Sequence, residues 1–380
     1  MTQKIFNKTM LITIIVVMMV VASIGGYKYF QYRKDKMENY ADYGIYTNSV
    51  IGTTVKMNAT TSVLLDQQGK PFYRFGDGGG GNGGMLGKLQ SIEPREENWQ
   101  IPSKIKAHWL TYEENQFYEG EFELPRDLIA QRLHEETRGL FLGNGSKKVN
   151  LNDTLLITFA PKGKMYVYLT GYTTKLVGNF QGKPIDYDWS QWLIENSSDE
   201  REIKAIKEGK NYYLTESDTR LDIPSRKEVV DSINNAPEIK SGIEKQPQYY
   251  NEGFFKPVKW QLKTKGQIDK LLGVDVAMVN GETEVLQDEN EIKNHVFTSV
   301  PVNITLDFVY QSKPYRENFD FDNSRFDYNF LYQRYISKFN PLERMDILVN
   351  RISDSEGELF FMQGEKKLEI EDLSVTALER

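Results

Sequence analysis

The stretch 101–137 constrains this fold most, because two segments of alternating apolar and polar residues are followed at once by a helical pattern. A period of two is typical of half-buried strands. Folding the segments about Glu113 and Glu114 pairs residues whose numbers sum to 227 or 229, and a one-residue slip would place lysines against aromatic rings. The sequence therefore predicts a β-hairpin of well-specified register. Its apolar face comprises Ile105, Ala107, Trp109, Tyr118, Phe122 and Leu124, and its polar face comprises Lys104, Lys106, His108, Glu119, Glu121 and Glu123.

A helix is predicted to follow this hairpin. Pro125 suits the first turn of a helix, and Leu128, Ile129 and Leu133 form an apolar stripe that can cover the hairpin. Gly139 is expected to end the helix.

The residue types present exclude several classes of site. The chain of 380 residues has no cysteine, so disulfides, thiolate nucleophiles and zinc–cysteine sites are excluded. A net charge of −7 argues against a nucleic-acid partner, which would require a basic face. With 39% hydrophobic and 27% charged residues, the chain has a globular balance and is long enough for two domains.

An uncharged run from Met10 to Tyr27 lies between basic flanks. Its eighteen residues would make a helix of about 27 Å, close to the thickness of the hydrocarbon core of a bilayer. A cleaved signal peptide is the alternative, because Ser23–Gly25 offers a small-x-small cleavage site. We expect a retained transmembrane anchor in the bacterial inner membrane.

The orientation of this anchor rests on two opposing signals. Basic residues slightly favour the C-terminal flank, which by the positive-inside rule would keep the body in the cytoplasm. Short N-terminal anchors before a large domain, however, usually act as uncleaved export signals. We expect a single-pass protein whose C-terminal body is periplasmic.

The expected fold class is α+β, with the transmembrane helix followed by two β-rich halves of antiparallel hairpins and packed helices. Turn glycines Gly163 and Gly357, and Lys-Leu pairs beginning at Lys175 and Lys367, lie about 190 residues apart. This spacing suggests an internal duplication, with chance recurrence of hairpins as the alternative. The predicted divisions are a basic N-terminus (1–9), the anchor (10–27), a spacer (28–49), a first α+β domain (50–224) and a second α+β domain (225–380).

Further elements follow from alternation, turn residues and helix signals. The sequence predicts hairpins from 153–160 with 165–170 and from 345–350 with 359–362, strands at 255–264, 300–310 and 318–321, helices at 188–207, 225–234 and 330–338, and an irregular segment at 237–257.

Three motifs resemble functional sites without completing them. The helix 134–138 nearly matches a zinc-protease motif, but Arg138 replaces the second histidine, so His134 is expected to be a solvated helix residue. The glycine-rich segment 76–84 before Gly87 imitates a phosphate loop, but the first glycine and the final hydroxyl residue of that motif are missing. The segment 320–324 begins like a calcium loop and lacks the essential glycine.

Acidic clusters are the remaining candidates for catalysis, but nothing in the sequence distinguishes an acid–base pair among them. We therefore expect no catalytic, cofactor-binding or metal-binding residues, and a protein that is not an enzyme. Segments 76–84 and 315–328 are candidate partner contacts, with a flexible linker and an ordinary sheet edge as their alternatives. The acidic clusters are Asp186/Asp188, Asp199/Glu200/Glu202 and Asp288/Glu289/Glu291.

The sequence resembles a bacterial envelope family known as domain of unknown function 2931. The resemblance rests on Ile101-Pro102, His108-Trp109, Gln116-Phe-Tyr118, Glu123-Leu-Pro125 and the segment 159–163. It implies a lipoprotein-like envelope protein, some of whose relatives are associated with immunity to type VI secretion phospholipase effectors. The chain departs from this pattern at Ile24, which stands where a lipidated cysteine is required.

Three functional hypotheses follow. The first is an immunity protein that binds and neutralises a secreted lipase effector. The second is a structural or assembly component of the cell envelope. The third is an enzyme with an unrecognised carboxylate site.

Overall fold

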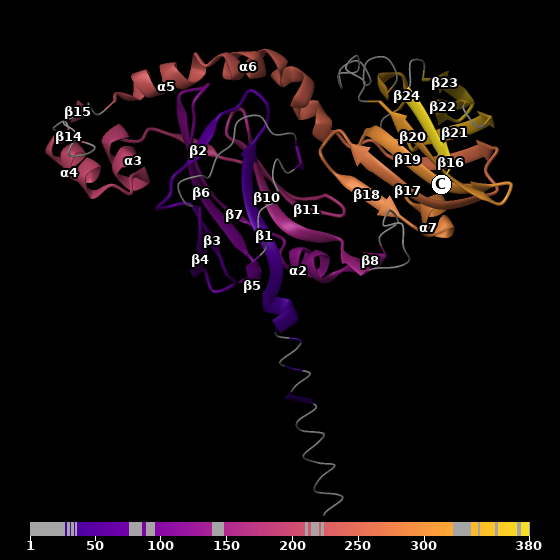
Figure 1. Ribbon diagram of the computed structural model, residues 1–380, viewed down its shortest axis with the longest axis horizontal. Coiled ribbons are helices and arrows are strands. Elements are labelled where there is room, and N and C mark those ends of the chain that lie inside the picture. Colours follow the sequence, from indigo (N-terminus) through magenta and orange to yellow (C-terminus); the bar gives the residue numbers. More distant parts are fainter. Residues whose placement is uncertain are drawn as a thin grey trace, which may run out of the picture.

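The chain folds into two β-rich lobes, one formed by the earlier and one by the later part of the sequence (Figure 1). The computed structural model describes residues 27–28, 31, 34, 36–75, 86–88, 96–138, 148–209, 212–213, 220–221, 224–321, 336–340, 343–353, 356–370 and 374–379.

The first lobe packs two sheets around one apolar core, to which both sheets contribute buried side chains. Strand β1 pairs in parallel with β10, and the neighbouring pairs are antiparallel. One sheet has the order β12 (Lys175–Gln181), β11 (Lys164–Gly171), β10 (Asn152–Ala160), β1 (Tyr40–Ser49) and β5 (Glu96–Gln100). The other has the order β13 (Lys183–Ile185), β7 (Gln116–Glu123), β6 (Lys104–Thr111), β3 (Val63–Leu65) and β4 (Pro71–Arg74), with β2 (Val55–Met57) also on β6.

The central hairpin has one of the two predicted registers. Lys104 lies opposite Glu123 and Trp109 opposite Tyr118, so paired residue numbers sum to 227. The Lys104 ammonium lies 2.6 Å from the Glu123 carboxylate. Trp109 is completely buried and stacks on Tyr118. The alternating pattern therefore predicted the hairpin with two possible registers, and the structure has the one whose sum is 227.

Strand β1 corrects the predicted spacer at 28–49. Residues 40–49 run through the interior of a sheet, and Tyr43 is completely buried. The strand was missed because its buried residues include polar Asn48 and Ser49.

The second lobe also contains two sheets. One has the order β16 (Trp260–Gly266), β21 (Met345–Ser353), β22 (Glu356–Gln363) and β23 (Lys366–Glu369). The other has the order β18 (Thr283–Leu286), β17 (Lys270–Met278), β19 (Pro301–Tyr310), β20 (Lys313–Asp320) and β24 (Ser374–Glu379).

The two lobes share one strand topology. The order β13-β7-β6-β3-β4 corresponds to β24-β20-β19-β17-β18, and β12-β11-β10-β1 corresponds to β23-β22-β21-β16. The parallel pair of β1 with β10 has its counterpart in β16 with β21. Even the stacked pair Trp109–Tyr118 has a counterpart in Phe308–Tyr315. This correspondence supports the predicted relation between the halves.

Helices cover one flank of the first lobe and connect it to the second (Figure 1). Val230 of α5 packs with Leu110 and Trp192, so α5 belongs with the first lobe, although a boundary was predicted before it. The segment 237–257, predicted to be irregular, contains a long helix and a 3-10 turn. The helices are α2 (Arg126–His134), α3 (Trp189–Asn196), α4 (Glu200–Glu208), α5 (Arg226–Asn234), α6 (Pro237–Tyr249), α7 (Glu289–Asn294), η1 (Glu252–Phe255) and η2 (Ile336–Lys338).

Small two-stranded ribbons complete the fold. They pair β8 (Glu136–Arg138) with β9 (Lys148–Asn150), and β14 (Tyr212–Tyr213) with β15 (Arg220–Leu221).

The helix after the central hairpin is shorter than predicted. Helix α2 ends at His134, because Glu135 is extended and leads into β8, so Gly139 does not end it. Ile129 and Leu133 are buried as expected, whereas Leu128 is 36% exposed. Among the helices that the structure describes, none is long and apolar enough to cross a membrane. The predicted anchor lies outside the described residues except for Tyr27.

Candidate functional site

The two lobes are joined by a tightly packed interface. The buried Tyr168 hydroxyl donates a hydrogen bond of 2.8 Å to the carbonyl of Asn280. The ring of Tyr166 stacks on Phe255 with centroids 4.3 Å apart. Six residues of the second lobe's core cluster come from the first lobe: Val50, Leu86, Leu156, Ala160, Tyr166 and Tyr168. One apolar cluster therefore spans both lobes, and its packing fixes the distance between them.

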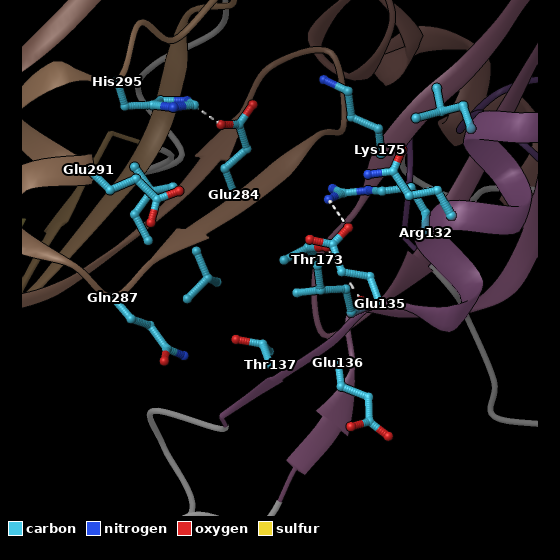
Figure 2. Close-up of a pocket in the computed structure, with 15 residues that line it drawn as sticks. Arg132, Glu135, Glu136, Thr137, Thr173, Lys175, Glu284, Gln287, Glu291 and His295 are labelled. Carbon is cyan, nitrogen blue, oxygen red and sulfur yellow. Dashed lines mark hydrogen bonds and ion pairs between the residues drawn. The ribbon is translucent and has the colours of Figure 1, made fainter.

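Beside this interface lies a cleft of about 470 Å³, which we call the inter-lobe cleft (Figure 2). Cavities at domain interfaces are common binding sites. Figure 2 shows Arg132 and Glu135 on one wall, with Glu284 and His295 across from them. The first lobe contributes Leu128, Gln131, Arg132, Glu135, Glu136, Thr137, Leu151, Thr173 and Lys175, and the second lobe contributes Glu284, Val285, Leu286, Gln287, Glu291 and His295.

An ion pair on one wall and a histidine–carboxylate contact on the other order the side chains of the cleft. Arg132 lies 3.3 Å from the Glu135 carboxylate. Across the cleft, Nε2 of His295 lies 2.6 Å from Glu284. The lining contains four glutamates against one arginine, one lysine and one histidine. The cleft is therefore polar, with a surplus of acidic groups.

A further ion pair joins the two lobes at Lys175, which lines the cleft. Lys175 of the first lobe lies 2.8 Å from Glu282 of the second, whose side chain is almost completely buried. The backbone N–H of Leu176 also donates to this carboxylate at 3.2 Å. This pair links the lobes directly.

The acidic clusters expected from the sequence serve as helix caps. Asp188 accepts a hydrogen bond of 2.7 Å from the N–H of Gln191. Asp199 accepts one from Arg201, and Asp288 begins α7 in the same way. Aspartate at this position satisfies a backbone donor that has no partner within the helix. The signal was present in the sequence, since an aspartate precedes each helical pattern.

His134 is not the solvated residue that was predicted. Its Nε2 lies 3.0 Å from the carbonyl of Tyr40, and the side chain is half-buried. The histidine thus fastens α2 to β1. The zinc-protease likeness of this helix has no counterpart in the structure, because Arg138 lies in β8 rather than in the helix.

Gly87 has a packing role that the phosphate-loop comparison did not suggest. It has a φ of +66°, and a Cβ atom there would lie 2.3 Å from the carbonyl oxygen of Gly281. Glycine is therefore required where the two lobes approach each other. The glycine-rich segment 76–84 itself lies outside the described residues.

The other predicted contact region is largely interior or undescribed. Tyr315 is only 7% exposed and stacks on Phe308, in a strand with neighbours on both sides. Residues 322–328, which include most of the calcium-loop likeness, lie outside the described residues. Within the described ranges, no three histidine, aspartate or glutamate side chains gather as a metal site.

His108 was expected on the polar face of the hairpin and is instead 6% exposed. Its ring contacts Phe117, Tyr187 and Trp192, which form an aromatic enclosure. Burial lowers the pKa of His108, while the nearby carboxylate of Glu195 opposes this shift. Helix α3, which supplies Trp192, covers this face of the hairpin. The alternation within the hairpin strands could not predict that cover, because α3 lies elsewhere in the sequence.

Residues of the family signature meet in the core of the first lobe. Trp109 packs between Tyr118 and Phe159, with centroids at 5.7 and 5.2 Å. A Cβ atom at Gly163 would lie 2.4 Å from the ring of Tyr118. The signature therefore specifies packing around one hairpin.

Comparison with known proteins gives a family and no characterised relative. No curated protein and no solved structure matches this chain. The model of the family described as "Protein of unknown function (DUF2931)" matches residues 33–235 of the 380. This match spans the first lobe with helices α2 to α5, and more than half of the sequence. The chain therefore belongs to the family of domain of unknown function 2931.

Proposed function

We propose that this chain is a non-enzymatic binding protein of the bacterial envelope that holds part of a partner protein in the inter-lobe cleft. The observation that carries the proposal is the cleft itself, whose walls come from both lobes. The shared core fixes the distance between the walls, so little conformational entropy is lost when a partner binds.

The proposed partner is a secreted phospholipase effector, which would make the chain an immunity protein. Support comes from the resemblance noted in the sequence, which implies an association with type VI secretion immunity. A neutralising protein needs a rigid scaffold and charge complementary to its target, rather than catalytic groups. The acidic surplus of the cleft would suit a basic surface on the effector.

The proposal places the body at the outer side of the inner membrane, anchored through residues 10–27. Support comes from the uncharged sequence of this segment and its basic flanks. A C-terminal reporter fusion that is active only outside the cytoplasm tests the orientation. Activity of a cytoplasmic reporter at the same position would contradict it.

Binding is tested with the full-length chain in detergent and the purified product of any phospholipase effector gene found beside its own. We expect a stable complex that Gln131→Trp and Gln287→Trp weaken at least tenfold, because each indole would fill the cleft. Gln67→Trp is the matched control, since Gln67 is exposed in the β3–β4 turn outside the cleft. Equal binding by all three variants would contradict the placement, and no complex with the wild-type chain would contradict the immunity role.

A further inference from the structure

Strand β18 forms an open edge of its sheet and lies along the inter-lobe cleft. The sheet order places β18 outermost, with β17 as its partner. Glu284, Val285 and Leu286 of this strand line the cleft. The outer row of backbone groups on an edge strand can pair with another extended chain.

The hydrogen bonds identify which backbone groups face outward. In an antiparallel pair, residues alternate between bonding to the partner strand and pointing away from it. Met278 of β17 donates to the carbonyl of Glu282 at 2.8 Å, so Glu284 and Leu286 also face β17. Thr283 and Val285 therefore direct their N–H and C=O groups away from the sheet.

Thr283 shows that this edge already accepts a strand-like partner. Its N–H donates to the carbonyl of Thr174 at 2.9 Å, and the N–H of Thr174 donates back at 3.2 Å. The two residues form an antiparallel bridge between the lobes.

The first lobe leaves the edge immediately after this bridge. The pair of Thr174 with Thr283 is an isolated bridge and does not continue into a longer ladder. Among the described residues, no group pairs with the outward N–H of Val285. The bridge thus sets the register in which a further antiparallel strand could pair with β18 inside the cleft.

We propose that the inter-lobe cleft binds an extended segment of a partner protein, which adds an antiparallel strand to β18 at Val285 and continues the bridge made by Thr174. Only the identity of the partner rests on the proposed immunity function. Main-chain hydrogen bonds would supply affinity, and the side chains of the cleft would select the sequence. The acidic surplus of the lining favours a segment with basic residues.

The test uses two substitutions at one position. Val285→Pro removes the outward N–H, and proline is tolerated on an edge strand where that N–H faces away from the sheet. Val285→Thr is the matched control, because it keeps the N–H and a β-branched side chain. The full-length variants are compared with wild type for thermal stability before binding is measured.

The probe is a displayed library of random ten-residue peptides, selected on the full-length wild-type chain. We expect enriched peptides to be extended and basic, to bind the Val285→Thr variant as they bind wild type, and to bind Val285→Pro at least tenfold more weakly. Equal binding to the proline variant, or no enrichment on wild type, would overturn strand addition.

Two further measurements separate the possible failures. If Val285→Pro is unstable, hydrogen exchange at the Val285 amide of wild type tests strand addition instead. A bound peptide should slow exchange at this amide at least tenfold. Unchanged exchange would overturn the proposal. Peptide binding without effector binding would reject the immunity role and leave strand addition standing.

Discussion

Arg351 of the second lobe occupies the place that Phe159 occupies in the first. Phe159 packs on Trp109 with ring centroids 5.2 Å apart, and the Arg351 guanidinium lies 4.9 Å from the ring centroid of Phe308. Arg351 is 1% exposed, and its Nε lies 3.6 Å from the completely buried carboxylate of Glu317. The second lobe therefore has an ion pair at the position where the first lobe has an aromatic contact.

Removing one member of this pair should be costly. Arg351→Met leaves the Glu317 charge buried without its cation, so we expect a loss of roughly 3–5 kcal/mol in the free energy of unfolding. Urea denaturation of the full-length chain measures it. The double variant Glu317→Leu with Arg351→Met should recover most of this loss, because two apolar side chains can replace a buried ion pair. A double variant as unstable as the single one would contradict this explanation.

The aromatic enclosure of His108 predicts a dependence of stability on pH. Burial lowers the pKa of His108 from 6.5, although Glu195 and Glu119 oppose the shift and Lys106 adds to it. The unfolded chain therefore binds the proton more tightly than the folded one. The stabilising contribution of neutral His108 is fully present above pH 6.5 and is lost as the pH falls through the pKa of His108 in the folded chain.

The comparison of wild type with His108→Gln isolates the contribution of His108 to the pH dependence of stability. Between pH 7.5 and 5.5, the wild-type chain should lose more unfolding free energy than the variant, because glutamine does not titrate. Equal losses in the two proteins would show that the neutral form of His108 is not favoured by the fold.

Gly87 should be intolerant of a side chain because the lobes meet there. Gly87→Ala would place Cβ 2.3 Å from the Gly281 carbonyl, so we expect a lower free energy of unfolding and a larger radius of gyration in solution scattering. Gly364→Ala is the matched control, with a similar φ of +60° and no atom within 4 Å of the added Cβ. The control should lose only about 1–2 kcal/mol, the cost of a left-handed backbone. Equal effects of both substitutions would contradict a role in lobe contact.

The capping explanation of the acidic clusters gives another matched pair. Asp188→Ala should destabilise the chain by about 1 kcal/mol, because the N–H of Gln191 loses its acceptor. Asp186→Ala, two residues away and outside the cap, should change stability by less than about 0.5 kcal/mol. Chemical denaturation distinguishes them, and a larger effect at Asp186 would count against the capping role.

Local patterns predicted the hairpins, and non-local packing determined most of what was missed. The alternation around Trp109 predicted the hairpin, although the face that was expected to be polar also carries the buried His108 and Leu110. Helix α6 was predicted to be irregular because it contains Gly242 and Pro247. Gly242 is explained by packing, since a Cβ atom there would lie 3.1 Å from the N atom of Gly52.

The inter-lobe cleft could not be predicted from the sequence. Arg132 and His295, which line opposite walls, lie far apart in the sequence, one in α2 and the other directly after α7. No spacing rule connects such residues, because their proximity depends on how the lobes pack. The same holds for the bridge from Thr174 to Thr283.

Hydrogen exchange of the full-length chain, alone and with the phospholipase effector proposed as its partner, tests the central claim most directly. Binding in the inter-lobe cleft predicts slower exchange in α2 and β8 on one wall and in β18 and α7 on the other, with little change in β4 or β23. Slower exchange confined to surfaces outside the cleft, or no change anywhere, would contradict the account.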